Sequence, residues 1–183
     1  MCPSPSSLFF ALPPAVLKRM FKSVTYKEML KINLLKKQKI KTEKVSLRQV
    51  TKKDWDFILK IRNAPEFRNA FYDQHTITKK KHYQYLQKQK TNPDFVNWII
   101  CYGKDDVGYV RILNNDISIM ISEKFNSKGI GTKALHLVGR EAKKLGIKKL
   151  VGRMMVHNKS SQKIFIKNKY KLLMYWYEKQ LHK

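Results

Sequence analysis

The order of the expected elements constrains the fold of this chain most. Three short strands, at residues 96–102, 107–112 and 117–121, follow one another with only short polar turns between them. After them the pattern alternates between helix and strand, in the order helix 131–145, strand 150–156, helix 160–168 and strand 170–177. A meander followed by such an alternation predicts an α/β chain of the mixed α+β kind. We expect a central, mixed, twisted sheet of about six to seven strands with helices on both faces.

Two helices and one more strand are expected before the meander. Val45, Leu47 and Val50 predict a strand, and Asp54 begins a helix that ends near Asn63, ahead of a proline. A second helix is expected from Thr76 or Thr78 to about Lys90.

Residues 1–44 have a different composition, with ten lysines and arginines against two glutamates. We expect a basic extension there that is partly helical, between residues 24 and 35, or flexible, and one domain over residues 45–183. A targeting segment, a functional tail and a start codon assigned too early all remain open for the extension.

The net charge of +26 would attract polyanions such as nucleic acid, anionic lipid or phosphorylated small molecules. An AT-rich coding sequence would also favour lysine, so charge alone does not decide the function. The two cysteines form no metal-binding spacing and predict no disulfide framework, which favours a reducing, cytoplasmic setting; organellar targeting by residues 1–44 stays open. No apolar run is long enough to span a membrane.

Two segments carry the chemistry. In the first, strand 117–121 leads to a loop whose glycines, Gly129 and Gly131, precede a helix. Free amides and the helix dipole make such a place suitable for an anion, a pyrophosphate above all, although an ordinary glycine turn is the plainer alternative. In the second, Asn158 and Ser161 lie one helical turn apart and can face one crevice, or Asn158 simply caps the helix.

Together these segments resemble the GNAT family of N-acetyltransferases. The phosphate motif of that family reads Asn126-Ser-Lys-Gly129-Ile-Gly131 here, and its later Asn-x-x-Ser motif continues from Asn158 to Tyr170. The resemblance implies acetyl-CoA as the cofactor and no metal. It implies that the coenzyme contacts the end of the third meander strand, the glycine loop and the later motif: Met120, Ile121, Ser122, Asn126, Ser127, Lys128, Gly129, Ile130, Gly131, Thr132, Asn158, Ser161 and Phe165.

This chain departs from the family pattern at two positions that matter. Asn126 replaces the usual Gln or Arg, and Phe165 replaces a tyrosine that protonates the leaving thiolate in many members. Acetyl transfer needs a base for the attacking amine, and the candidates are Asp116, Glu123 and His157. The oxyanion donor is expected to be a backbone amide near Met120.

For the acceptor, the segments around Arg62, Asn63, Arg68 and His82 resemble the branch that acetylates nucleotide-linked amino sugars. A neighbouring branch acetylates the N-termini of proteins, including ribosomal proteins. A third possibility is a catalytically silent acyl-CoA-binding or nucleic-acid-binding protein. A ribosome or a nucleic acid is a possible partner but is not favoured over a small-molecule amine. Either a monomer or a homodimer is compatible with the sequence.

Overall fold

The structure is a computed structural model that describes residues 44–179 and 181. The expected helix at 24–35, and all of the basic extension except Lys44, lie outside these residues. Four antiparallel strands form the sheet in the order β1 (Val45–Gln49), β2 (Phe95–Tyr102), β3 (Asp105–Leu113) and β4 (Asp116–Ile121). The β3–β4 turn places Asn114 and Asn115 at positive φ, which suits a tight hairpin and which asparagine tolerates.

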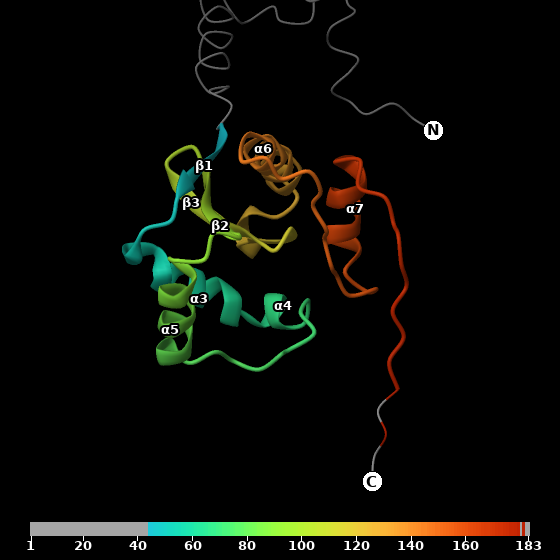
Figure 1. Ribbon diagram of the computed structural model, residues 1–183, viewed down its shortest axis with the longest axis horizontal. Helices are drawn as coiled ribbons and strands as arrows, with labels where there is room; N and C mark the ends of the chain where they lie inside the picture. Colours follow the sequence, from blue (N-terminus) through green and yellow to red (C-terminus); the bar gives the residue numbers. More distant parts are fainter. Residues whose placement is uncertain (1–43, 180, 182–183) are drawn as a thin grey trace, which may run out of the picture. The chain divides into compact units, whose positions relative to one another are not determined.

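Helices cover both faces of this sheet (Figure 1). On one face, α3 (Trp55–Asn63) and α5 (Lys79–Gln89) pack on Ile99, Tyr109 and Met120. On the other face, α6 (Ile130–Lys144) packs on a core that includes Ile100, Val110 and Ile117. The mixed α/β fold with two covered faces is therefore confirmed. Consecutive buried residues of a strand, such as Ile99 and Ile100, point to opposite faces, so that each face has an apolar core for helices to cover.

Three short elements and one further helix complete the described chain. Two 3-10 turns, Lys52–Asp54 and Glu123–Phe125, precede α3 and α6, and α7 spans Lys159–Lys167. The short helix α4 (Pro65–Arg68) was not expected, although Pro65 at its first position is a favourable helix start.

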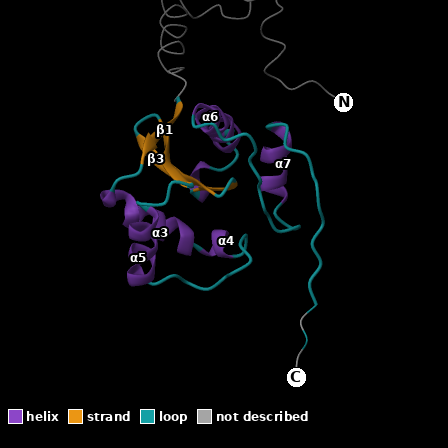
Figure 2. Cartoon of the chain, viewed as in Figure 1, coloured by secondary structure: helices purple, strands orange, loops and turns teal. Residues whose placement is uncertain are grey.

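The expected strand at 150–156 is wrong except for one residue. Val151 makes a single parallel bridge to Asp116, with Val151 N–H donating to the Asn115 carbonyl and Ile117 N–H donating to the Val151 carbonyl, both at 2.8 Å. Beyond Val151 the chain packs against α7 instead, because Gly152 lies directly against the ring of Phe165. Figure 2 therefore draws this segment as loop between α6 and α7.

The expected strand at 170–177 is also wrong. Lys169, at φ +64°, ends α7, and the chain then continues without pairing to any described strand. Six consecutive apolar side chains from Leu172 to Tyr177 are 66–89% exposed. Their composition is typical of a strand, but a strand forms only beside a partner, and the segment after Val151 offers no continuous edge. The sheet has four strands rather than six or seven.

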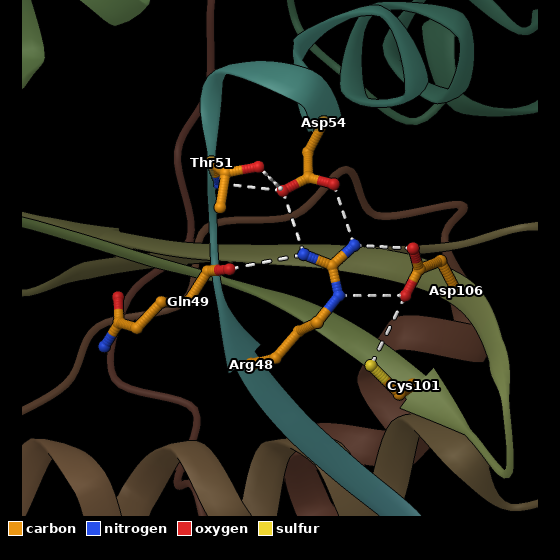
Figure 3. Close-up of polar contacts among 6 residues, drawn as sticks. All are labelled: Arg48, Gln49, Thr51, Asp54, Cys101 and Asp106. Carbon is orange, nitrogen blue, oxygen red and sulfur yellow. Dashed lines mark hydrogen bonds and ion pairs between the residues drawn. The ribbon is translucent and has the colours of Figure 1, made fainter.

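Arg48 ties the start of α3 to the β2–β3 hairpin (Figure 3). Its guanidinium donates two hydrogen bonds to Asp54, at 2.7 and 2.9 Å, and two more to Asp106. Asp54 also accepts from the Thr51 backbone amide at 2.7 Å. The hydrogen bonds from Arg48, followed by those from Thr51, lower the pKa of Asp54 to about 2 despite its partial burial.

Within the described residues, no helix is both long and apolar enough to cross a membrane. The same part of the chain has no group of three His, Cys, Asp or Glu side chains that could hold a metal ion.

Candidate functional site

The single bridge at Asp116 leaves most of the outer edge of β4 without a neighbouring strand. In an antiparallel pair, alternate residues direct their amides to the partner strand and the others direct theirs outward. Ser122 N–H donates to the Val107 carbonyl of β3, and Ile117 N–H donates outward to Val151. The alternation between these two fixed points places the amides of Ile119 and Ile121 outward.

These two outward amides meet no acceptor in residues 44–179, because the segment after Val151 packs against α7 and not beside β4. An added Cβ at Gly108 of β3 would lie 2.4 Å from the Met120 carbonyl oxygen, which shows that the polar groups of Met120 are turned toward β3 instead. The backbone amides available for the expected oxyanion role are therefore those of Ile119 and Ile121, and not that of Met120. The open edge can hold an extended amide-bearing ligand by β-strand-like pairing.

The loop between β4 and α6 exposes a helix N-terminus. Gly129 is the N-cap residue of α6, has a left-handed backbone at φ +72°, and provides no side-chain cap. The first intrahelical bond runs from Lys133 N–H to the Gly129 carbonyl, so the amides of Ile130, Gly131 and Thr132 remain available. A 15-residue helix that begins in this way is suited to bind a phosphate group.

The side chains around this loop add positive charge and shape. Ser127 has φ +61°, and the exposed Asn126 donates its backbone amide to the Glu123 carbonyl. The Lys128 ammonium lies 5.0 Å from the centre of the Phe125 ring. Gly131 has a different task from Gly129, because an added Cβ there would lie 2.7 Å from Ile164 Cδ1. Its missing side chain lets α7 approach α6.

The later motif lies at the start of α7. Asn158 Oδ1 accepts the Ser161 backbone N–H at 3.0 Å, so Asn158 is the N-cap of α7. This capping leaves the side-chain nitrogen of Asn158, Nδ2, and the hydroxyl of Ser161 without a hydrogen-bond partner among the described residues. Asn168, which the sequence analysis did not single out, joins the two helices by donating to the Thr132 and Ile164 carbonyls at 3.2 and 3.0 Å.

Phe165 is 7% exposed and belongs to the core beneath α6. Its ring lies 4.7 Å from that of Tyr170, in an edge-on arrangement, and against Gly152. Phe165 therefore helps to fix the position of the segment after Val151, which diverges from β4. Burial raises the pKa of the Tyr170 hydroxyl.

The three candidate bases occupy different places. Asp116 begins β4 on the same face as Ser118 and Met120, and its Oδ1 atom is buried without a hydrogen-bond partner. His157 is exposed, and its Nε2–H donates to the Asn69 carbonyl at 2.9 Å, which leaves Nδ1 as the basic nitrogen of the neutral ring. Glu123 is exposed in the loop that leads to α6, at the far end of β4 from Asp116.

The four candidate acceptor residues divide into two kinds. Asn63 is fully engaged, since its side chain donates to the Ile77 carbonyl and accepts from the Ile77 amide, both at 2.8 Å. His82 is 5% exposed and bonds the Trp55 carbonyl at 2.9 Å, and burial lowers its pKa. Arg62 Nη1 and Arg68 Nε are buried without a partner.

Arg111 on β3 shares that property, and the sequence analysis did not include it in the site. Its Nη1 atom is buried and unpartnered, and its charge acts on Arg62. A signal was present in the sequence, because Arg111 follows Tyr109 by two residues and so lies on the same face of a strand.

Comparison with known proteins agrees with this geometry. A family model described as the acetyltransferase (GNAT) domain matches residues 44–171. An uncharacterised protein of Methanocaldococcus jannaschii is 29% identical over 130 residues, and the match covers 67% of this chain but only 27% of that protein. The chain thus spans about a quarter of the length of this curated relative.

Two solved structures have the same fold. A domain from Methanocaldococcus jannaschii superposes with a TM-score of 0.63 at 27% identity, over 70% of this chain and 88% of that one. Spermidine N-acetyltransferase from Vibrio cholerae, in complex with CoA and spermine, gives a TM-score of 0.61 at 14% identity, over 67% and 78% of the two chains. With a family model that covers well over half of its length and an open β4 edge that leads to an uncapped α6, this chain belongs to the GNAT family of acetyltransferases.

Proposed function

We propose that this protein transfers the acetyl group of acetyl-CoA to a primary amine by direct attack of the amine on the thioester. The observation that carries the proposal is the unpaired edge of β4 that runs into the uncapped start of α6. An extended thioester with a pyrophosphate at its far end matches both features. The β4 edge has free N–H groups that need acceptors, and the start of α6 attracts an anion. Acetyl-CoA supplies the activated acetyl group.

The start of α6, the edge of β4 and the start of α7 each support one binding role. The amides of Ile130, Gly131 and Thr132 would hold the pyrophosphate, with Ser127 and Lys128 beside them. The amide of Ile119 or Ile121 would donate to the thioester oxygen as negative charge develops on it. Asn158 and Ser161 would border the pantetheine arm from the start of α7.

Asp116 is the strongest of the three candidate bases. Its Oδ1 atom, buried and without a hydrogen-bond partner among the described residues, lies on the α3 face of β4, and we expect the acceptor to approach the outward edge from this face. His157 is the second candidate, through Nδ1. Phe165 has no proton to give, so the thiolate would take its proton from solvent or leave unprotonated.

For the acceptor we propose the amino group of a nucleotide-linked amino sugar, which the basic surroundings of Arg62 and Arg68 favour. A protein N-terminus is the second candidate, and the net charge of +26 would help such an enzyme to dock on a ribosome. The spermine of the Vibrio cholerae complex is a cation, and the arginines of this chain make a polycation the less suitable acceptor.

Isothermal titration of acetyl-CoA tests the central claim with a matched pair of variants. Gly129→Asp places a carboxylate at the start of α6, and Gly146→Asp places one just beyond its end, at the same left-handed backbone and in equally open space. We expect micromolar binding by the wild type and by Gly146→Asp, and loss of binding by Gly129→Asp. Equal binding by both variants, or no binding by the wild type, would refute the assigned cofactor site.

A further inference from the structure

Three arginines each have one buried side-chain N–H group with no hydrogen-bond acceptor among residues 44–179 and 181: Arg62 at the end of α3, Arg68 in α4 and Arg111 in β3. Buried donors are nearly always satisfied in folded proteins, and a charged donor without a partner is the costliest kind to bury. Each of these three guanidinium groups, only half-buried as a whole, thus has at least one N–H donor available to an anion.

The register of the sheet places Arg111 on the face that α3 and α5 cover. Ile99, Tyr109 and Met120 form one row across β2, β3 and β4, and α3 and α5 cover that row. The next row on the same face is Asn97, Arg111 and Ser118. The apolar core thus gives way to a polar row with an arginine in its middle.

Arg62 lies on α3, the helix that packs on this face of the sheet and contacts β3. Its guanidinium stacks 4.0 Å above the Phe71 ring and donates only Nη2–H to the protein, to the Asp73 carbonyl at 3.1 Å. Burial lowers the pKa of Arg62, and the charge of Arg111 acts in the same direction. The two like charges therefore repel each other across the contact between α3 and β3.

The acidic groups nearby do not neutralise the pair. Asp73 attracts Arg62 at longer range, but its carboxylate is bonded to His75, and no ion pair joins Asp73 or Asp116 to any of the three arginines among the described residues. Arg111 and Arg68 donate no side-chain hydrogen bond at all within residues 44–179.

We propose that Arg62 and Arg111, together with Arg68 of the adjoining helix α4, form an anion subsite that binds a phosphate or carboxylate group of the acceptor. This subsite rests on the proposed acetyl transfer and states its substrate class: an amine that also bears an anionic group. Guanidinium groups bind both kinds of oxyanion through paired N–H donors. The anion would hold the amine on the α3 face, within reach of Asp116 and of the open edge of β4.

Arg111→Gln is the decisive variant, because Arg111 makes no hydrogen bond that folding would lose. Arg140→Gln is its control, since Arg140 is exposed on α6 and makes no hydrogen bond or ion pair in the described part, so that the variant loses the same charge elsewhere. Both proteins are first saturated with CoA, which occupies the α6 terminus. Inorganic phosphate and succinate are then titrated separately by calorimetry, so that the two arms distinguish a phosphate from a carboxylate.

We expect the wild type and Arg140→Gln to bind at least one of these anions with the same affinity, and Arg111→Gln to bind it at least about tenfold more weakly. Equal binding by the two variants, or no binding of either anion by the wild type, would overturn the subsite. If acetyl-CoA itself does not bind, the proposed function fails on its own, and the same titration without CoA still tests the arginines.

Turnover provides a second test, with glucosamine and glucosamine 6-phosphate as acceptors that differ by one phosphate. The wild type and Arg140→Gln should have the lower KM for the phosphorylated acceptor. In Arg111→Gln this difference in KM between the two acceptors should disappear. A preference that survives in Arg111→Gln contradicts the proposal.

Discussion

Individual charged residues in the described part of this protein differ in how many partners they have. Arg48 makes four side-chain bonds to two aspartates, whereas Arg111 makes none. The first kind of residue holds elements together, and the second kind is available to a ligand. Substitutions should therefore affect stability in one place and catalysis or binding in the other.

Asp54 belongs to the first kind, and its contribution should depend on pH. Its folded pKa of about 2 lies below the ordinary value of 3.8, so its charged form stabilises the fold above about pH 4, and this stabilisation is lost as the pH falls toward 2. Asp54→Asn should lower the urea midpoint at pH 7, with the difference from wild type shrinking below pH 4. Asp94→Asn, at an exposed carboxylate that makes no side-chain hydrogen bond among the described residues, is the control and should leave the urea midpoint at pH 7 near the wild-type value.

Asp116 belongs to the second kind. If it is the base, Asp116→Asn should lower kcat by about 10² or more while the Kd for acetyl-CoA stays unchanged. Glu123→Gln, at the far end of β4, should leave kcat near the wild-type value. Steady-state kinetics with calorimetry separates these effects, and a larger loss in His157→Gln would transfer the role to His157.

At the scale of whole elements, the site depends on α7 keeping the chain after Val151 away from β4. Phe165 lies so close to Gly152 that an added Cβ would come within 2.1 Å of its ring. The contact links the position of α7 to the width of the opening beside β4. The helix α7 is in turn joined to α6 through Asn168.

Gly152→Ala should therefore destabilise the protein by about 1–3 kcal/mol, as overpacking of a core does. Gly139→Ala, in the interior of α6 with open space around it, should instead stabilise by up to about 1 kcal/mol. Chemical denaturation measures both changes. The double variant Gly152→Ala with Phe165→Leu should recover part of the loss, and a failure to recover any would mean that the ring is not the cause.

The backbone of β4 provides a second prediction at this scale. Hydrogen exchange at Ile119 and Ile121 should be fast in the free protein and should slow on addition of acetyl-CoA. The amide of Met120, already turned toward β3, should be protected in both states. Residue-resolved exchange by NMR checks this alternation, and equal protection of all three amides in the free protein would contradict the open edge.

Much of this arrangement could be predicted from sequence, and the failures have a common cause. The first four strands and helices α3, α5, α6 and α7 follow from local periodicity and caps, as at Thr78, which accepts the Lys81 amide. The strands at 150–156 and 170–177 failed because pairing depends on a neighbour that local sequence does not specify. Arg111 was missed because the two-residue period gives the face on which it lies but not its neighbours, which come from the register across three strands.

At the scale of the whole molecule, the net charge of +26 should speed the encounter with anionic substrates. Stopped-flow association of acetyl-CoA should slow markedly when salt rises from about 50 to about 200 mM, because the Debye length shortens. The dissociation rate should change much less, since the close contacts at α6 are screened less. An association rate that ignores salt would show that the surface charge serves something other than this encounter.

The single bridge at Asp116 has a consequence for how the protein behaves in a cell. Under the proposed function, acetyl-CoA completes this open sheet edge only when it is bound, so binding and folding would be linked. At a concentration about a hundredfold above the Kd, such linkage adds about 2.7 kcal/mol to the stability of the folded state. The abundance of the protein would then rise and fall with the supply of acetyl-CoA, and metabolic state would govern how long each molecule survives.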